Sequence, residues 1–318
     1  MAQERYGIFP ARFGDLTLRQ IHAVEVRTGN SKSEPIPGGA IDRGAVITAF
    51  AEPMITLRTT DLGGLFGGTP WLGISSGYRV GVADAYTTNP TIVQYQRRVD
   101  GSTFSQTDTE HLLLTSTKGW LGLDELTAEQ DSLIGAEASV NYWCLAPDAV
   151  TPPLTIARDT GGLTSTPNFG GLWYLGPCYL GTVGSNNQIY GVKRVTVRPN
   201  LEYRPKRSDG GPWATHGAIH SRKSEIVLTI DKASEAYEKF SGMFGNLVSA
   251  SALTCFFQKG SPGGTRIAYN TASHIKVVGS TGDNTVDQFS VTNEDDVSID
   301  VTFRSTAALT LTTGQQIA

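Results

Sequence analysis

The chain has 318 residues, of which 39% are hydrophobic and 18% charged, so it is long enough to bury one large core or two ordinary ones. A net charge of -4 at pH 7 argues against a protein that wraps a nucleic-acid backbone, since such proteins need a surplus of Lys and Arg. No apolar run reaches the roughly 18 residues that span a bilayer, and the first residues lack the apolar stretch of a signal peptide. We therefore expect no membrane contact and a chain that folds in a cytoplasm.

The 36 glycines and 15 prolines, together with few long helical windows, are typical of many short strands joined by turns. This composition predicts a mainly β fold. The three cysteines, Cys144, Cys178 and Cys255, form an odd set without a close pair. They indicate buried free thiols, and neither a disulfide framework nor a cysteine zinc site.

An internal repeat organises the chain. A strand-like stretch at 20–24 leads through a long polar loop to a second one at 52–61, and the same events recur at 188–192 and 223–231. Further matches follow in the same order: Phe66-Gly67 with Phe244-Gly245, Val93-Gln94-Tyr95-Gln96 with Phe256-Phe257-Gln258, His111 with His274, and 139–144 with 298–303. The alternative is a loose alignment of any two β-rich stretches, but matches in one order are harder to obtain by chance. We predict two tandem copies of one β domain, at 1–145 and 177–318.

The segment 146–176 between the copies contains Pro147, Pro152, Pro153 and Pro167 and two Gly-Gly pairs. Proline fixes its own φ and biases the preceding residue toward extended conformations. We therefore predict a Pro/Gly-rich linker that joins neither sheet.

Alternation of apolar and polar residues predicts strands with one buried face at 226–231 and 297–304. Such one-sided sheets are expected in antiparallel barrels and sandwiches. The spacing of Ala233, Ala236, Tyr237 and Phe240 predicts a helix over 232–240 that packs through these side chains. Its counterpart at 62–65 is shorter and weakened by glycine.

Motifs associated with catalysis or metal binding lack the context that they need. The G-x-S-x-G pattern at 73–77 precedes a strand-like stretch rather than a helix, which favours an ordinary turn. His216 and His220 enter a strand without a neighbouring Glu base, and the acidic run at 293–296 lacks the alternation of a calcium loop. His111 and His274 occupy matching places, which favours a shared structural role. We therefore predict no catalytic residues, no metal site, no cofactor and no enzyme.

The loops at 27–44 and 198–217 are long, polar and basic and occupy one position in the repeat. Mixed charge with an aromatic residue suits a contact with another subunit, and the alternative is a mobile solvated hairpin. The predicted contact residues are Lys32, Glu34, Asp42 and Arg43 in the first loop and Arg204, Lys206, Arg207, Asp209 and Trp213 in the second.

The stretch 191–230 combines a strand, a charged Gly-Pro hairpin ending near Asp209-Gly210-Gly211-Pro212, and a second strand at 219–228. This pattern resembles major tail tube proteins of long, non-contractile-tailed bacteriophages, and it recurs in the first copy, so the resemblance covers most of the chain. It implies two tandem tail-tube-like β-barrel or sandwich domains, each with at most a short helix, that close a barrel through oligomerisation. Closing a sheet through neighbouring subunits also removes exposed edges.

The resemblance further implies a virion protein of the tail, assembled in the cytoplasm of a bacterial host, without catalytic residues. Six domains usually form a ring in that family, so three chains would form a pseudo-hexameric ring. Stacked rings enclose a channel through which DNA passes without specific binding, and the long hairpins reach to the neighbouring ring. The implied partners are the chain itself and tape measure, tail terminator and baseplate proteins. A mildly acidic protein suits such a channel, because positive charge would hold DNA in place.

Two other functions remain open at this point. The five tryptophans, which lie near predicted turns and strands, motivate a two-domain carbohydrate-binding β module. The second alternative is another ring component of the tail or baseplate, which is a function close to that of a tail tube subunit. Assembly into rings separates both tail components from a monomeric glycan-binding protein.

Overall fold

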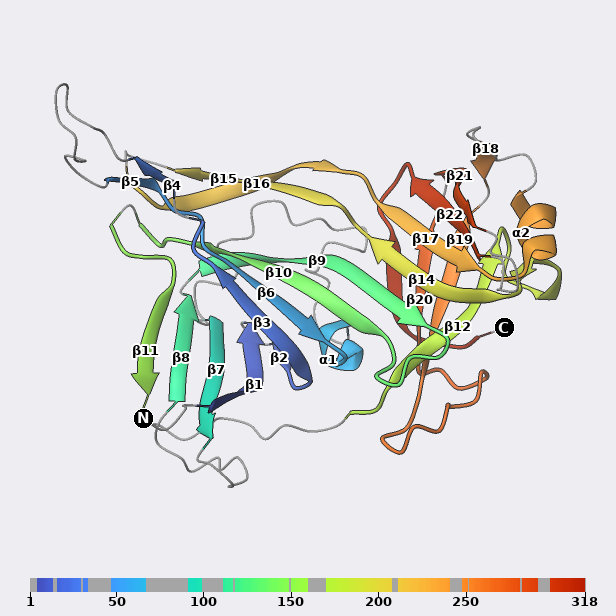
Figure 1. Ribbon diagram of the computed structural model, residues 1–318, viewed down its shortest axis with the longest axis horizontal. Helices are drawn as coiled ribbons and strands as arrows, with labels where there is room; N and C mark the ends of the chain where they lie inside the picture. The colour runs from blue at the N-terminus through green and yellow to red at the C-terminus, as the bar shows by residue number, and fades with distance from the viewer. Residues whose placement is uncertain are drawn as a thin grey trace.

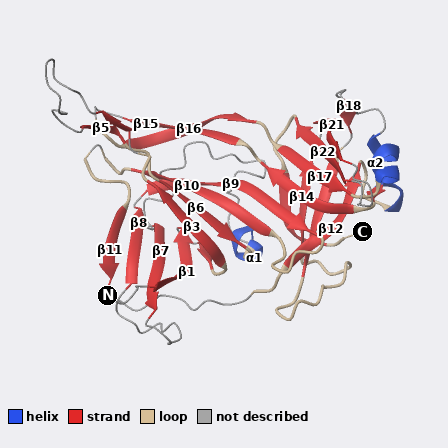
Figure 2. Ribbon diagram, viewed as in Figure 1, coloured by secondary structure: helices blue, strands red, loops and turns tan. Residues whose placement is uncertain are grey.

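A computed structural model describes residues 5–13, 16–29, 31–33, 47–66, 91–98, 111–116, 118–148, 150–159, 170–207, 211–240, 248–250, 252–280, 282–290 and 298–317. The described chain is mainly β, as the composition predicts, with many antiparallel strands and two α-helices (Figures 1 and 2). Neither helix in this described part has the length and apolar character that a membrane-spanning helix needs.

A nine-stranded antiparallel sheet runs through both halves of the sequence (Figure 1). Its strands, in spatial order, are β18 (Val248–Ala250), β21 (Gly282–Ser290), β22 (Ser298–Ser305), β17 (Glu225–Ile230), β14 (Val192–Arg198), β9 (Lys118–Glu129), β10 (Glu137–Leu145), β6 (Met54–Thr59) and β3 (Ile21–Arg27). The first half of the chain supplies β3, β6, β10 and β9, and the second half supplies the corresponding order β14, β17, β22 and β21. The pairing of β9 with β14 joins the two sets.

Two five-stranded sheets complete the two halves, and their strand orders also correspond. The first contains β2 (Leu16–Leu18), β1 (Arg5–Phe13), β7 (Thr91–Arg98), β8 (His111–Ser116) and β11 (Thr155–Asp159). The second contains β13 (Gln188–Ile189), β12 (Trp173–Leu180), β19 (Leu253–Lys259), β20 (His274–Gly279) and β23 (Thr310–Gln315). Among the residues that the structure describes, none of the sheets closes on itself into a barrel.

Two hairpins extend from the sheets at corresponding places. The first pairs β4 (Ser31–Ser33) with β5 (Ile47–Phe50), and the second pairs β15 (Leu201–Arg207) with β16 (Ala214–Arg222). Figure 1 shows the β15–β16 ribbon running from the second half across the strands of the first half. Its far end lies beside β4 and β5.

Backbone irregularities recur in both halves. In β1 the register against β7 shifts between Ile8 and Ala11, and in β12 the register against β19 shifts between Leu175 and Cys178. Each bulge contains a proline, at Pro10 and Pro177. Because proline has no N–H to donate to the ladder, a bulge is one of the few sheet positions that accepts it.

A second irregularity marks the start of the polar hairpins. The register of β3 against β6 shifts between Ile21 and Ala23, and that of β14 against β17 shifts between Val192 and Arg194. Seven residues past the extra residue of each bulge, the chain turns with a positive φ, 57° at Gly29 and 47° at Asn200. The two halves therefore share strand order and local backbone geometry, even where their side chains differ.

The core lies between the nine-stranded sheet and the two five-stranded sheets. Ile226, Leu228 and Ile230 are 0% exposed while Val227 and Thr229 are half-buried, so the predicted alternation in this strand is confirmed. One contiguous hydrophobic cluster includes residues from both halves, such as Leu57 and Val301. The division into domains ending at 145 and beginning at 177 remains a prediction.

The expectation that 146–176 joins neither sheet is wrong. Thr155–Asp159 forms β11, which pairs along its whole length with β8, and β12 begins at Trp173 within the same segment. The prolines Pro152 and Pro153 lie before Leu154, outside β11, and leave the N–H groups of the strand free to pair. The connection between the halves therefore also completes a sheet.

The helix α2 (Ala233–Phe240) confirms the predicted helix, and α1 (Leu62–Phe66) is its shorter counterpart. Ala236 and Phe240 are buried as expected, but Tyr237 is 64% exposed, so its predicted packing role is wrong. Glu235 takes the buried place instead and lies 3.7 Å from the ammonium of Lys232. All three cysteines are free and buried, as predicted.

Candidate functional site

The nine-stranded sheet has one apolar face against the core and one face that carries charged and hydroxyl groups, because successive side chains point to opposite sides. We call the second one the polar face. Its described carboxylates are Glu25, Asp124, Glu125, Glu129, Glu137, Glu225, Asp283 and Asp300, and its described basic groups are Arg27, Arg58, Lys118, Arg194, Arg198 and Arg304. The described part of this face is therefore acidic on balance.

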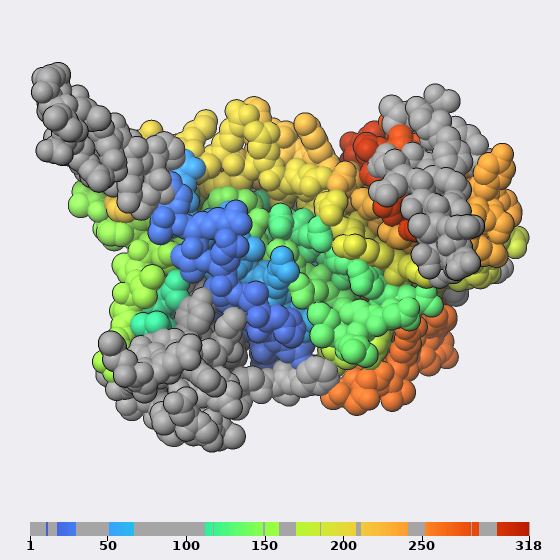
Figure 3. Space-filling view, in the orientation of Figure 1, coloured from blue at the N-terminus to red at the C-terminus, as the bar shows by residue number. Residues whose placement is uncertain are grey.

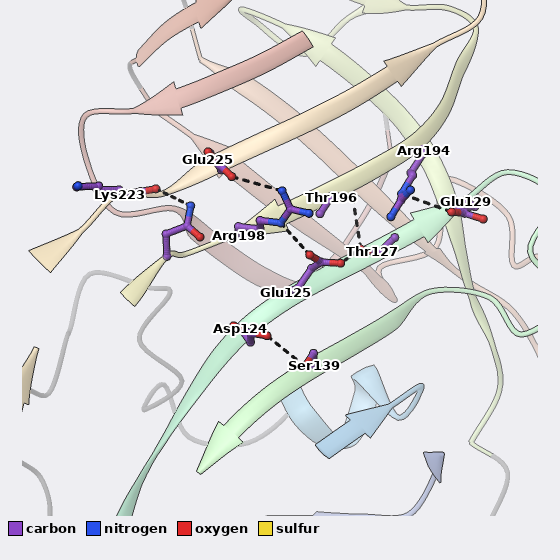
Figure 4. Close-up of polar contacts among 11 residues, drawn as sticks. Asp124, Glu125, Thr127, Glu129, Ser139, Arg194, Thr196, Arg198, Lys223 and Glu225 are labelled. Atoms are coloured by element: carbon purple, nitrogen blue, oxygen red, sulfur yellow. Dashed lines mark hydrogen bonds and ion pairs between the residues drawn. The ribbon is translucent and has the colours of Figure 1, made fainter. Parts of the chain in front are cut away.

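The junction between the halves lies on this face, where β9 pairs with β14 (Figure 4). Arg198 Nε donates a 2.8 Å hydrogen bond to Glu125 Oε2, and Arg194 Nε lies 3.4 Å from Glu129 Oε1. Between these ion pairs, the hydroxyls of Thr127 and Thr196 lie 3.4 Å apart, within hydrogen-bond distance. Each of these three contacts joins one residue from the first half to one from the second.

Arg198 also lies 3.6 Å from Glu225 on β17, so its guanidinium bridges three neighbouring strands. Partial burial alone would raise the pKa of the Glu125 carboxyl. Hydrogen bonds from Arg198 and Thr127, with the charge of Arg198, outweigh burial and lower that pKa below its ordinary value. The hydrogen bond to Glu125 correspondingly raises the pKa of Arg198.

A bulge in β9 adds one carboxylate to the polar face. The register against β10 shifts so that Ser139 lies opposite Glu125 and Val140 lies opposite Leu123, which leaves Asp124 as the extra residue. Ser139 Oγ donates to Asp124 Oδ2 at 3.4 Å, so Asp124 also lies on the polar face (Figure 4). A regular strand would have placed either Asp124 or Glu125 on the core side.

Two shallow depressions on the polar face share Arg58, Asp124 and Ser139 in their linings. Both depressions are lined by acidic and basic side chains. Within the described ranges, no group of three or more His, Cys, Asp or Glu side chains is arranged to hold a metal ion. The chemistry of these depressions is that of a charged surface.

The β15–β16 ribbon covers one end of the polar face through aromatic stacking. The ring of Tyr203 lies parallel to that of Trp120 at 5.1 Å, and Trp143 contacts both rings, at 4.6 Å from Trp120 and 5.1 Å from Tyr203. Burial raises the pKa of the Tyr203 hydroxyl. The space-filling view shows the yellow ribbon residues in contact with the green strands of the first half (Figure 3).

Backbone contacts fix the far end of the ribbon to the first half. Ala51 N donates to Pro212 O at 3.0 Å, and Ala146 N donates to Ala214 O at 2.7 Å. A parallel bridge joins Ala51 to Trp213, so the predicted contact residue Trp213 lies beside the base of the first hairpin. Burial raises the pKa of the neighbouring Glu52, and the charge of Arg207 opposes this rise.

The remaining predicted contact residues separate into two groups. Arg204 is exposed and pairs with Glu202 on its own strand at 2.6 Å, and Lys206 lies opposite His216 in the ribbon. Lys32 belongs to β4, whose side chains are not described, while Glu34, Asp42, Arg43 and Asp209 lie outside the described residues. The structure thus brings the far end of the second predicted loop to the base of the first, and the predicted contacts with other subunits remain predictions.

Sequence reasoning predicted one buried and one polar side for β17 and β22, but it identified neither the polar face of the whole sheet nor the residues of the junction. Alternation within β10 and β14 is present in the sequence and could have identified one polar side on each strand. The pairing of β9 with β14 has no local signal, because it joins strands from different halves of the chain. The bulge at Asp124 has none either.

Of the histidines considered in the sequence whose side chains the structure describes, one is buried and hydrogen-bonded and two are exposed. His274 is 0% exposed, accepts a hydrogen bond from Lys259 N at Nδ1, and lies 3.0 Å from Ala268 O at Nε2. His216 and His220 are exposed on β16. The G-x-S-x-G pattern at 73–77 and the acidic run at 293–296 lie outside the described residues.

Comparisons with known proteins do not assign the chain to a class. No protein-family model matches it, and no curated protein matches it.

Proposed function

We propose that this chain is a structural subunit of a phage tail tube, which assembles as stacked rings around a channel for DNA. The proposal combines the resemblance of the two hairpin-containing stretches to tail tube proteins with the strand arrangement. It requires no catalytic group and no cofactor. The site of action is the polar face of the nine-stranded sheet together with the two edges of that sheet.

The observation that carries the proposal is the pairing of β9 with β14. β9 is the last strand of the first set of four, and β14 is the first strand of the second set. A joint between the last strand of one unit and the first strand of the next is heterologous, so the same joint can be repeated. Heterologous joints produce a closed ring when the rotation per unit closes.

The edges of the sheet support repetition of this joint. In the described chain, β3 forms one edge, and the only strand beyond β21 at the other edge is the short β18. β18 pairs with Gly282, Asp283 and Asn284, so the C-terminal part of β21, which pairs with β22 on one side, has no strand partner on its outer side among the described residues. Open edges of this kind promote pairing with another chain, and a closed barrel removes them.

The polar face supports a passage for DNA. When the sheet curves into a ring with its apolar face against the outer five-stranded sheets, the polar face lines the interior. Its surplus of carboxylates repels phosphates, so DNA slides without being held. The arginines are largely neutralised locally, as Arg198 is by Glu125 and Glu225.

The proposal places the chain in the tail of a virion, assembled in the cytoplasm of a bacterial host. Three chains would supply six copies of the repeated unit for each ring. Tape measure, tail terminator and baseplate proteins would be its partners at the channel and at the ends of the tube. Another ring component of the tail or baseplate would use the same joint but would not stack into long tubes.

Negative-stain electron microscopy of the purified chain, with light scattering across a concentration series, tests the proposal. We expect rings or tubes with a central hole, and a mass per ring that corresponds to three chains. Isolated rings that never stack would favour another tail component. Monomers under all conditions would overturn the proposal.

The carbohydrate-binding alternative depends on accessible tryptophans. Trp120 stacks with Tyr203, Trp143 contacts both of these rings, and Trp173 is only 5% exposed. These three rings therefore offer little surface to a sugar. A glycan array on monomeric protein is the direct comparison, and specific binding there would favour this alternative.

A further inference from the structure

The two sets of four strands can be superposed residue by residue through their ladders. One row of directly paired residues crosses each set: Val24, Leu57, Val140 and Leu123 in the first, and Val195, Leu228, Val301 and Val286 in the second. Both rows end next to a bulge. The extra residue of that bulge is Asp124 in β9 and Asp287 in β21.

The correspondence at both ends of the row fixes which residues would meet in a repeated joint. Inside the chain, Leu126 lies opposite Val197 and Thr127 lies opposite Thr196. Leu126 is the third residue after Leu123, as Phe289 is after Val286. Val26 follows Val24 by two positions, as Val197 follows Val195.

We propose that β3 of one chain pairs antiparallel with the C-terminal part of β21 of a second copy, with Val26 opposite Phe289 and Glu25 opposite Ser290. This inference deepens the proposed function, since it names the partner strand and its register. The pairing of β18 with β21 ends at Asn284, well before this stretch, so it does not compete with the new partner. The backbone of β21 is extended through Ser290 and is ready to continue the ladder.

The joint between chains differs in chemistry from the joint inside the chain. The internal joint contains Arg198 and Glu125, and the corresponding residues between chains are Arg27 and Gln288. Arg27 Nε lies 2.8 Å from Glu25 on its own strand, so its charge is already balanced. The proposed joint therefore depends on the backbone ladder and not on an ion pair between chains.

Disulfide trapping in the full-length chain tests the register. In the double variant Glu25→Cys with Ser290→Cys, the new thiols occupy the places of Thr196 and Thr127, whose hydroxyls are 3.4 Å apart. Mild oxidation should join chains into a ladder of covalent oligomers on a non-reducing gel. The native cysteines are buried and should not contribute.

A matched control uses Glu25→Cys with Thr285→Cys. Thr285 lies five residues before Ser290 on the same strand, which displaces the thiol by roughly 16 Å. This pair and each single variant should give no ladder. Equal crosslinking of the two double variants would overturn the proposed register.

A gain-of-function variant gives a second readout. Gln288→Glu should provide Arg27 with the carboxylate that Arg198 has in the internal joint, and should lower the concentration needed for assembly by about twofold, since Arg27 is exposed and already paired with Glu25. The gain should vanish when Arg27→Gln is added. A gain that persists with Arg27→Gln would contradict the proposed opposition of these two residues.

The outcomes separate the register from the function. Rings in the microscope without crosslinking of Glu25→Cys to Ser290→Cys would overturn the joint and leave the tube proposal standing. Crosslinked chains that never close into rings would support the joint and count against the tube. Neither rings nor crosslinks would overturn both.

Discussion

Arg198 donates a 2.8 Å hydrogen bond to Glu125 across the junction of β14 with β9. The two residues lie in different halves of the chain, and each is half-buried. Because Arg198 also contacts Glu225, a single guanidinium connects the last strand of the first set with the first two strands of the second. The two sets of strands are therefore joined by side-chain contacts as well as by backbone hydrogen bonds.

We expect Glu125→Gln to lower the free energy of unfolding by about 1 kcal/mol, because it weakens charged hydrogen bonds in a group that keeps partial solvent contact. Glu129→Gln is the matched control on the same strand. Its pair with Arg194 is more exposed, so the loss should stay below about 0.5 kcal/mol. Urea denaturation of both variants measures the difference, and equal losses would contradict a special role of Glu125.

The junction also predicts a pH dependence. The pKa of Glu125 is lowered in the folded state, so the folded chain holds this carboxyl in its charged form more readily than the unfolded chain does. Its contribution to stability is present above the ordinary pKa of 4.5 and is lost as pH falls through the folded value. Urea denaturation at pH values from about 7 down to about 3 measures the free energy of unfolding. This free energy should fall less for Glu125→Gln than for the parent chain. Parallel curves would contradict this assignment.

Tyr203→Ala should release the β15–β16 ribbon from Trp120 and Trp143. The loss of stacking and burial should cost about 2 kcal/mol and raise the solvent exposure of both indoles. Tryptophan fluorescence should shift to longer wavelength, and limited proteolysis should cut the ribbon faster. Tyr203→Phe keeps the ring and should behave like the parent chain, and a similar loss in both variants would exclude stacking as the cause.

Gly29 and Asn200 should respond differently to alanine, although both have positive φ. A Cβ at Gly29 would overlap the carbonyl oxygen of Glu52, so Gly29→Ala should cost about 2 kcal/mol or more. Asn200→Ala loses a 3.0 Å hydrogen bond to Lys223 O and places a Cβ at positive φ, so it should cost about 1–2 kcal/mol, whereas Asn200→Gly loses the same bond without the strain and should cost about 1 kcal/mol or less. Thermal unfolding of the three variants gives this ranking, and a neutral Gly29→Ala would show that the turn adapts.

The native thiols should resist modification. Burial raises the pKa of Cys144 to about 12, and a hydrogen bond with Cys178 together with burial raises the pKa of Cys255. At about pH 8 an aromatic disulfide reagent should therefore react with none of the three cysteines in the folded chain and with all three in urea. Rapid reaction of the folded protein would show that the cores open locally.

Local patterns in the sequence predicted the parts of the fold that local physics determines. Composition predicted a mainly β chain, and alternation predicted the buried face of β17. Helical spacing predicted α2 but assigned Tyr237 to the wrong side, because a short helix at the end of a sheet buries only a narrow stripe. The prediction that the linker joins neither sheet was wrong because the local sequence of Thr155–Asp159 carries no sign that this segment pairs with β8.

The sequence by itself determined strand content, the order of the repeated elements and the position of two long hairpins, because periodicity and turn chemistry act over a few residues. Only the tertiary structure decided that β9 pairs with β14, that Asp124 joins Glu125 on one face, and that Tyr203 covers Trp120 and Trp143. These relationships join residues far apart in sequence, or depend on a register shift that a single extra residue creates. Sheet edges are likewise a property of the whole ladder, which is why the surface proposed for assembly appears only after the strands are paired.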